Sequence, residues 1–327
     1  MKKHIVITSI FEPTEAVHKF SNLSDYQLIV VGDKKSPTLW QAGSAQFLSV
    51  SDQEKLTYHL AESLPFNHYS RKMLGYLEAI RQGAQLIVDT DDDNIPYDDW
   101  SFPSFDGDFL QFSEPGFVNV YHYFSTQHIW PRGLPLRLIN KRFQFEKAAV
   151  ANSKVGIWQG LADEDPDVDA IYRLTSDVPC FFDKKPPIVL KKGAICPFNT
   201  QNTAIVKELF PLLYLPTYVT FRYTDILRGL VAQPLMWHYG YELGFTTATV
   251  IQKRNPHDYM KDFVSEIPMY ETGEQVIQWV SESIDPAASL HQNLKNAYVR
   301  LEREGVVEAK ELTSLENWLY DLSALGH

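Results

Sequence analysis

Aspartates crowd one short stretch of this chain, directly after a run of aliphatic residues. Six carboxylates lie between Asp89 and Asp99, and four of them occupy the five positions from Asp89 to Asp93. Carboxylate oxygens are the ligands that Mg²⁺ and Mn²⁺ prefer, and these ions often take substrate phosphates as further ligands. The cluster therefore predicts a metal site that binds a diphosphate. A solvated acidic loop is the alternative interpretation.

The position of the cluster favours the metal site. Leu86, Ile87 and Val88 have the pattern of a fully buried strand, and the aspartates follow without a break. In open α/β sheets, ligands bind at the carboxyl ends of the strands. An Asp-x-Asp motif is thus expected at a sheet edge and not at a mobile loop tip.

Other residue types could complete such a site. His257 follows the last predicted strand and could reach the metal. Basic residues near predicted strand ends could clamp phosphate oxygens, although solvated surface charge is the alternative. These residues are Arg71, Lys72, Arg132, Arg137, Arg222, Arg228, Lys253 and Arg254. Cys180 and Cys196 lack the spacing of a zinc or redox site and are expected to be buried thiols.

Competing catalytic signatures are missing from the sequence. It contains no Gly-x-Ser-x-Gly elbow, no His-Glu-x-x-His motif and no Gly-x-x-x-x-Gly-Lys phosphate loop. No Gly-x-Gly-x-x-Gly follows the first predicted strand. These patterns mark serine hydrolases, zinc proteases, P-loop proteins and dinucleotide-binding domains, so the sequence favours none of these classes.

The first ninety residues must position the aspartates, and their pattern predicts βαβ units around a mainly parallel sheet. Strands are expected over 4–10, 26–31, 45–50 and 86–88, and helices near 13–15, over 52–62 and over 71–81. Ser70 can cap the helix over 71–81, and Gly83 suits a left-handed residue after its end.

Residues 97–190 are rich in proline and aromatic residues and predict an elaborated insertion. Strands are expected there over 108–112 and 117–124. Beyond it, strands are expected over 194–198, 218–221 and 244–251, with helices over 203–209 and 224–239. After Pro268 three helices are expected, over 271–283, 286–304 and 307–325. The predicted domains are a catalytic unit, 1–267, and a helical extension, 268–327.

The composition of the chain limits the classes of function that are expected. The chain has 327 residues, 44% of them hydrophobic and 22% charged, with 30 Lys and Arg against 41 Asp and Glu, for a net charge of −11. Such a chain is globular, and without a basic surface it is not expected to bind nucleic acid. No apolar run approaches a membrane span and no signal peptide is evident, so a soluble cytoplasmic protein is expected.

Several blocks of the sequence resemble the STELLO family. They occur in collinear order over about residues 1–265, and the resemblance implies a GT-A type nucleotide-sugar-binding fold. The blocks are 64–80, Gly83-Ala84, Asp89-Thr90-Asp91-Asp92-Asp93-Asn94, Trp130-Pro131-Arg132-Gly133-Leu134-Pro135-Leu136, 160–175, 197–203 and Arg222-Tyr223-Thr224-Asp225-Ile226-Leu227-Arg228-Gly229.

A fainter resemblance is to the reversibly glycosylated polypeptides, the UDP-arabinopyranose mutases. That family shares the Asp-Asp-Asp block, an Arg-Gly-x-Pro element and an Arg-Tyr-x-Asp element. The chain differs where that family has its self-glycosylated arginine, because Ile139 stands there and Arg137 lies two residues before it. It also differs where that family has a histidine after the last strand, because Val250 or Ile251 stands there.

The resemblance implies roles for single residues. Asp91 would lie near the nucleotide ribose, Asp93 would bind the metal and Asp92 would support them. Asp225 would be the catalytic base, although a capping aspartate at the start of a helix is the alternative. The implied sets are metal ligands Asp91, Asp93 and His257; nucleotide-binding residues Asp91, Asp92, Arg71, Lys72, Arg222 and Arg228; and an acceptor groove of Trp130, Tyr121, Tyr123 and Trp158.

The leading functional hypothesis is a glycosyltransferase that needs Mn²⁺ or Mg²⁺ and a nucleotide-diphosphate sugar. Its acceptor would be a glycan or glycolipid of a cell-surface polysaccharide pathway. A catalytically silent GT-A-like assembly partner is the second hypothesis, and a nucleotide-sugar mutase is the third. Peripheral association with membrane-bound biosynthetic machinery and a homo-oligomer through the C-terminal helices are further expectations.

Overall fold

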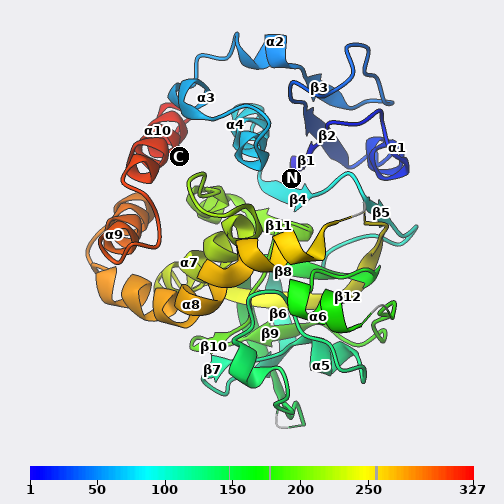
Figure 1. The fold of residues 1–327 in the computed structure, drawn as a ribbon, viewed down its shortest axis with the longest axis vertical. Helices are drawn as coiled ribbons and strands as arrows, with labels where there is room; N and C mark the ends of the chain where they lie inside the picture. The colour runs from blue at the N-terminus through cyan, green and yellow to red at the C-terminus, as the bar shows by residue number, and fades with distance from the viewer. Residues whose placement is uncertain (147, 177, 255–256) are drawn as a thin grey trace.

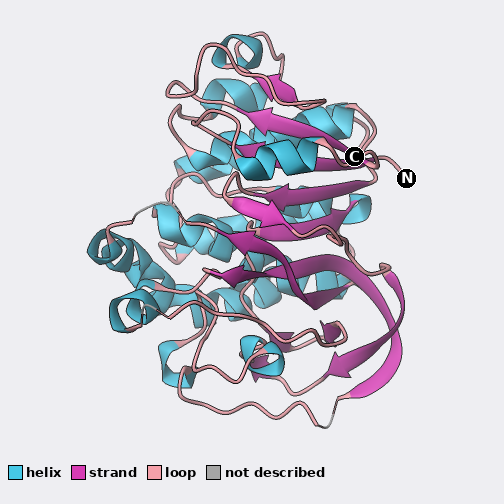
Figure 2. Ribbon diagram, turned by 90° about the vertical axis from the view of Figure 1, so that its right-hand side faces the viewer, coloured by secondary structure: helices cyan, strands magenta, loops and turns pink. Residues whose placement is uncertain are grey.

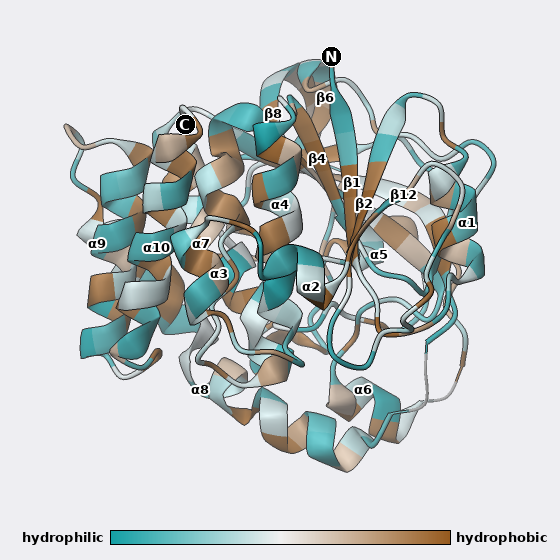
Figure 3. Ribbon diagram, turned by 90° about the horizontal axis from the view of Figure 1, so that it is seen from above, coloured by the Kyte–Doolittle hydropathy of each residue, from teal (hydrophilic) through white to brown (hydrophobic). Residues whose placement is uncertain are grey.

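A ten-stranded mixed β-sheet forms the centre of the molecule, with the strand order β3-β2-β1-β4-β11-β8-β6-β9-β12-β5. The computed structural model describes residues 1–146, 148–176, 178–254 and 257–327. Figure 2 shows the strands stacked through the molecule, with helices packed beside them. Strand β4 and the later parts of β1 and β2 are hydrophobic, and α9 and α10 present hydrophilic stretches (Figure 3).

The N-terminal part of the sheet is parallel, as the sequence predicts. It contains β1 (Lys3–Thr8), β2 (Tyr26–Val31), β3 (Gln46–Leu48) and β4 (Leu86–Thr90). The connecting helices are α1 (Glu15–Ser21), α2 (Val50–Gln53), α3 (His59–Ser63) and α4 (Lys72–Arg81). The helix expected over 52–62 is thus two short helices.

Helix α4 packs closely on the sheet through Gly75. A Cβ atom at Gly75 would lie 2.6 Å from Cγ1 of Val6 and 2.8 Å from Cγ2 of Val31. Ser70 does not cap this helix, which a 3₁₀ turn (Tyr69–Arg71) precedes, while Gly83 takes the left-handed conformation with φ of 84°. The close contact fixes the start of α4 beside the carboxyl end of β4.

Beyond β4 the sheet becomes mixed. Strand β11 (Asn202–Val206) runs antiparallel to both β4 and β8. The helix expected over 203–209 is therefore wrong: β-branched residues pair with strands on both sides, and a 3₁₀ helix containing Pro211 follows. The structure's longest strand, β8 (Ala149–Glu164), was not predicted; it curves along one side of Figure 2 and pairs with β6, β11 and β12.

The insertion contributes strands to the sheet and short helices around it. Residues 117–124, expected as a strand, form the end of β7 and the single-turn helix α5; residues 218–221 form no strand and lead into a 3₁₀ turn. The remaining elements are β5 (Asn94–Pro96), β6 (Asp106–Phe112), β7 (Gly116–Phe117), α5 (Tyr121–Phe124), a 3₁₀ turn (Leu136–Leu138), α6 (Ala170–Thr175), β9 (Ile188–Leu190), β10 (Ala194–Ile195), the 3₁₀ segments η3 (Lys207–Leu213) and η4 (Phe221–Tyr223), α7 (Thr224–His238) and β12 (Glu242–Gln252).

The C-terminal helices are α8 (Tyr259–Ser283), α9 (Leu290–Arg303) and α10 (Lys310–Ala324). Helix α8 begins twelve residues before the expected start at 271 and continues through Pro268, so the predicted domain boundary falls inside a helix. Asp258 caps its N-terminus by accepting a hydrogen bond from the Lys261 amide. No helix in the described ranges is both long and apolar enough to cross a bilayer.

Candidate functional site

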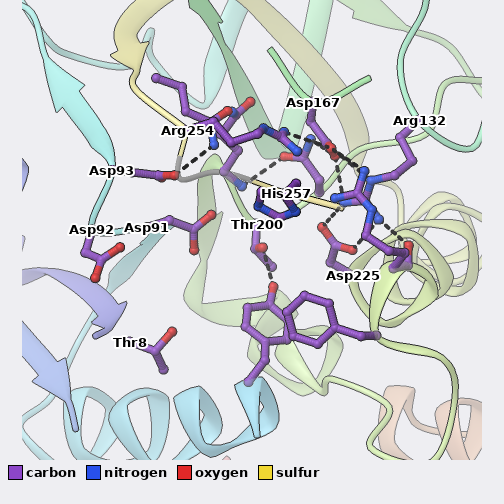
Figure 4. A pocket seen from close by; sticks show the side chains of 16 residues that line it. Thr8, Asp91, Asp92, Asp93, Arg132, Asp167, Thr200, Asp225, Arg254 and His257 are labelled. Atoms are coloured by element: carbon purple, nitrogen blue, oxygen red, sulfur yellow. Dashed lines mark hydrogen bonds and ion pairs between the residues drawn. The ribbon is translucent and has the colours of Figure 1, made fainter. Parts of the chain in front are cut away.

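A pocket of about 230 Å³ lies where β1 and β4 end, and we call it the central pocket. Figure 4 shows the side chains that line it. Six residues that the sequence predicts for the site meet there: Asp91, Asp92, Asp93, Arg222, Asp225 and His257. They come from parts of the chain more than 150 positions apart. The remaining lining residues are Thr8, Tyr69, Arg132, Asp167, Asn199, Thr200, Gln201, Phe221, Gln252 and Arg254.

The three neighbouring aspartates lie in different settings. Asp91 Oδ1 lies 2.9 Å from Nζ of Lys72, and burial raises the pKa of Asp91 to about 6. Asp92 accepts a hydrogen bond of 2.5 Å from Oγ of Ser9, and burial raises its pKa to about 6 as well. Burial also raises the pKa of Asp93, whose Oδ1 is buried without a hydrogen-bond partner among the residues that the structure describes. Burial therefore disfavours the anion of all three carboxyl groups.

These aspartates fit a divalent cation in their chemistry. Among the residues that the structure describes, no three His, Cys, Asp or Glu side chains are already arranged around a common metal position. The buried Oδ1 of Asp93 and the raised pKa values of the three aspartates nevertheless indicate that a cation would stabilise these carboxylates. A site with few protein ligands suits Mg²⁺, which usually keeps water molecules and takes substrate phosphates.

His257 points into the central pocket from the segment between β12 and α8 (Figure 4). Its Nδ1 lies 3.1 Å from Oδ2 of Asp262, which leaves Nε2 as the other potential ligand atom. A carboxylate on one ring nitrogen commonly orients a histidine that binds metal through the other. The geometry is thus compatible with the metal role that the sequence analysis expects.

Lys72 and Arg228 lie beneath the central pocket and do not line it. Nζ of Lys72 is 2.6 Å from Oδ1 of Asp89 and donates to the carbonyl of Thr90. Nη1 of Arg228 is 2.7 Å from the other oxygen of Asp89, and its Nη2 donates to the carbonyl of Asn199. These cations neutralise Asp89 and hold the pocket walls; the structure gives them no direct access to a ligand in the pocket.

Arg71 lies in a neighbouring pocket of about 260 Å³, the β1–β2 pocket, at the carboxyl ends of those strands. Its Nε donates to Gln53 and its Nη1 donates to the carbonyl of Leu64. Gly32 and Asp33, which follow β2, form another wall. Four residues line both pockets, so the two form one continuous cleft: Thr8, Tyr69, Asp92 and Phe221.

Arg132 holds two carboxylates at the back of the central pocket. Its Nη1 and Nη2 donate to the two oxygens of Asp225 at 3.0 and 2.8 Å. Its Nε and Nη2 donate to Asp167 at 2.9 and 2.8 Å. Burial alone would raise the pKa of Asp167, but the Arg132 guanidinium outweighs burial and holds that pKa well below its usual range. Asp225 is therefore a paired side chain and not simply a helix cap.

Arg222 completes this charge network from the other side. Its Nη2 lies 3.9 Å from Oδ1 of Asp167, and its Nε donates to Glu266 of α8 at 2.9 Å. Glu266 and Asp262 are contributions that the sequence analysis missed, because both lie in a segment without a recognised motif. Arg132 and Arg254, which the sequence analysis considers as possible phosphate clamps, both line the central pocket, whereas no role was expected for Asp167.

The aromatic residues expected to form an acceptor groove do not line the central pocket. Trp158 is completely buried, with its ring against Gly244, and Trp130 is 3% exposed with its Nε1 donating to Asp169. Tyr121 is buried, and the hydroxyl of Tyr123 donates to the carbonyl of Pro186. The groove prediction is wrong because Trp130, Tyr121 and Trp158 fill the core, and the partly exposed Tyr123 does not line the central pocket either. Cys180 and Cys196 are buried free thiols, as predicted.

Comparison with known proteins gives consistent matches. A family model described as STELLO glycosyltransferases matches residues 222–327. Probable glycosyltransferase STELLO1 of Arabidopsis thaliana is 28% identical over 349 residues, covering 100% of this chain and 45% of the relative. Probable glycosyltransferase STELLO2 of the same plant is 32% identical over 260 residues, covering 73% of this chain and 34% of the relative.

The matches extend the similarity beyond the sequence blocks described above. The family model includes α8, α9 and α10, whereas the resemblance seen in the sequence ended near residue 265. The chain spans less than half the length of either plant relative. The similarity to STELLO proteins therefore covers both the helical tail and the site.

Proposed function

The chain is a relative of the STELLO glycosyltransferases, and on that premise we propose that it transfers a sugar from a nucleotide-diphosphate donor in the presence of Mn²⁺ or Mg²⁺. The acceptor is a glycan or glycolipid of a cell-surface polysaccharide. One observation carries the proposal: the central pocket gathers Asp91, Asp92 and Asp93 with Arg222 and Arg254 at the carboxyl edge of the sheet.

The fold supports a GT-A type assignment. Four parallel strands, β3-β2-β1-β4, are followed by the antiparallel strand β11, and the cleft opens at the carboxyl ends of β1, β2 and β4. Such an edge is where open α/β sheets bind nucleotides. We assign the base and ribose of the donor to the β1–β2 pocket, and the diphosphate to the central pocket.

The metal would be held by Asp91, Asp93 and His257, with Asp262 orienting the imidazole. A bound divalent cation would neutralise the diphosphate as it leaves the sugar. Lys72 fixes Asp91 from below, and Asp92 is held by Ser9. Arg222 and Arg254 face the same space and add positive charge to a protein with a net charge of −11. The local charge thus suits an anionic donor.

Asp225 is the proposed base for the acceptor hydroxyl. It lies in the central pocket at the start of α7, where the helix dipole favours its anion. Both of its oxygens accept hydrogen bonds from Arg132, so proton transfer requires one of them to be shared with the acceptor. This pairing also favours the second candidate function, a catalytically silent assembly partner in which Arg132 and Asp225 only stabilise the fold.

A thermal-shift screen tests the proposal. Nucleotide-diphosphate sugars that bind should raise the melting temperature in Mn²⁺ and lose this effect in EDTA, because binding stabilises the folded state by mass action. Donor hydrolysis or transfer by the sugar that binds would support the enzyme. Binding without hydrolysis or transfer across a broad panel of acceptors would favour the silent partner. No binding by any nucleotide sugar would refute the glycosyltransferase and leave the silent partner as the better proposal.

A further inference from the structure

A third pocket, of about 320 Å³, adjoins the central pocket on the side away from the β1–β2 pocket. It shares Gln252 and Arg254 with the central pocket and no residue with the β1–β2 pocket. The other residues that line it come from the end of β8, from α6, from the segments that follow β8, α6 and β12, and from the start of α8. They are Glu164, Asp165, Arg173, Ser176, Val178, Pro179, Lys253 and Tyr259. We call it the Arg173 pocket.

Arg254 stands between the two pockets and is held there only by long ion pairs among the described residues. Its side chain is 7% exposed, its Nε lies 3.4 Å from Oδ2 of Asp165, and its Nη2 lies 4.0 Å from Oδ1 of Asp167. The buried Nε makes no hydrogen bond within the described part of the chain. The guanidinium can therefore donate hydrogen bonds to a ligand that supplies oxygen atoms.

Arg173 faces the same pocket from α6. Its side chain is 11% exposed, its Nη1 is paired with Asp165 and its Nη2 donates to the carbonyl of Pro166. Its Nε, like that of Arg254, is buried without a partner among the described residues. Lys253 adds an exposed ammonium group at the rim. Three cations therefore face two carboxylates, Glu164 and Asp165, in a protein whose overall charge is strongly negative.

We propose that the Arg173 pocket binds an anionic group of the acceptor, either a phosphate or a carboxylate. This inference rests on the proposed function, because the donor occupies the β1–β2 and central pockets and leaves the Arg173 pocket for the second substrate. The acceptor is then a sugar phosphate or a uronic acid residue, with its anion on Arg173 and Arg254 and its hydroxyl directed to the central pocket. A neutral sugar lacks the group that these arginines require.

Calorimetry with three related sugars tests the inference: glucose 6-phosphate, glucuronate and glucose, at constant ionic strength. The wild-type protein is expected to bind one or both anions and not glucose. Arg173→Gln should weaken anion binding about tenfold, the scale of one lost charge-assisted contact. Arg137→Gln is the matched control, since Arg137 is exposed and paired with Glu274 elsewhere.

The outcomes separate the possible sources of the anion. Binding of glucose 6-phosphate alone indicates a phosphorylated acceptor, and binding of glucuronate alone indicates a uronic acid. Should Arg173→Gln fail to fold, Lys253→Gln, on the rim, is expected to weaken binding about threefold. Equal binding of glucose, unchanged anion binding in Arg173→Gln, or no anion binding overturns the inference. Anion binding by a protein that binds no nucleotide would refute the proposed function alone.

Discussion

At the scale of single residues, Asp93 gives the clearest test of the proposed metal site. Within the described part of the chain, its buried Oδ1 has no hydrogen-bond partner, and its Oδ2 accepts a 3.2 Å hydrogen bond from Gln252. We expect Asp93→Ala to abolish Mn²⁺-dependent binding of a nucleoside diphosphate in calorimetry. Asp98→Ala, which removes an exposed carboxylate from the same loop region, should leave binding unchanged. Equal binding by the wild type in EDTA would contradict the metal role.

The raised pKa values of Asp91 and Asp92 predict a pH dependence. Both rise by burial from the ordinary value of 3.8 to about 6, so the metal-free folded state retains protons that the unfolded chain has lost. Their contribution to stability is complete below pH 4 and is lost as the pH rises through 6. Mn²⁺ requires the anions, so the rise in Tm that Mn²⁺ produces should be small at pH 5 and maximal above pH 7.

Differential scanning calorimetry from pH 5 to pH 8 measures how the rise in Tm that Mn²⁺ produces depends on pH. The variant Asp91→Asn should reduce the dependence on pH, since it removes one of the two carboxyl groups. An Mn²⁺-induced shift of the same size at pH 5 and pH 8 would show that these aspartates do not bind the ion.

A substitution of Asp225 distinguishes an active glycosyltransferase from a catalytically silent assembly partner. Asp225→Asn keeps the shape of the side chain but removes the base, so turnover should fall by about 10²-fold or more. Nucleotide affinity should stay nearly unchanged, because Asp225 lies on the Arg132 side of the pocket and not among the three aspartates. Transfer at the wild-type rate would mean that Asp225 only holds Arg132.

Helix α8 shows that a single element can belong to both the tail and the site. Its Glu266 is completely buried and accepts hydrogen bonds from Arg222, the Ala170 amide and the Tyr270 hydroxyl at 2.8 to 2.9 Å. Ser265 accepts a hydrogen bond from the Arg222 amide through its side chain. One turn of α8 therefore positions both an arginine of the central pocket and the start of α6, which carries Arg173.

Removing the charge of Glu266 should destabilise the protein and so test this positioning role. Glu266→Gln leaves Arg222 without its carboxylate partner in a buried setting, and we expect a loss of about 3 kcal/mol in the free energy of unfolding. Urea denaturation measures the loss, with Glu271→Gln on the exposed side of α8 as control. A variant as stable as the wild type would mean that Arg222 finds another partner, with Asp167 the nearest.

The elements that the sequence predicts well are those with local signals. Strands β1, β2 and β4 and helix α7 follow clear hydrophobic patterns, so the aspartates and Asp225 could be located before the structure was known. Strand β11 was mistaken for a helix because its five residues owe their conformation to pairing with β4 and β8. The Arg132–Asp167–Asp225 network was missed because three distant segments supply it, and no spacing rule connects them.

At the scale of the whole molecule, the C-terminal helices are a structural part of the fold. The carboxylate of Glu311 in α10 accepts hydrogen bonds from the amides of Thr217 and Tyr218, which lead into η4 and the site. Glu311 is fully buried, and Trp318 and Leu322 on the same helix are buried in the core. The expectation of a separate extension after residue 267 therefore understates how α8, α9 and α10 pack against the rest of the molecule.

Truncation after residue 268 should consequently lower the melting temperature or prevent cooperative unfolding, and it should also abolish nucleotide binding. Calorimetry of the full chain and the shortened chain measures both effects. Glu311→Gln provides a milder test, because it keeps the helix and weakens only its contact with the 217–218 loop. Unchanged melting and nucleotide binding in the shortened protein would show that the tail is dispensable.

Asp321 joins the two extremes of the chain. Its two oxygens accept hydrogen bonds from the amides of His59 and Leu60, 262 and 261 positions away, at the start of α3. During synthesis, the N-terminal amides of α3 therefore lack this acceptor until α10 has left the ribosome. Helix α3 is thus made early but completed late, so a ribosome stalled before α10 would carry a chain whose α3 still lacks this partner.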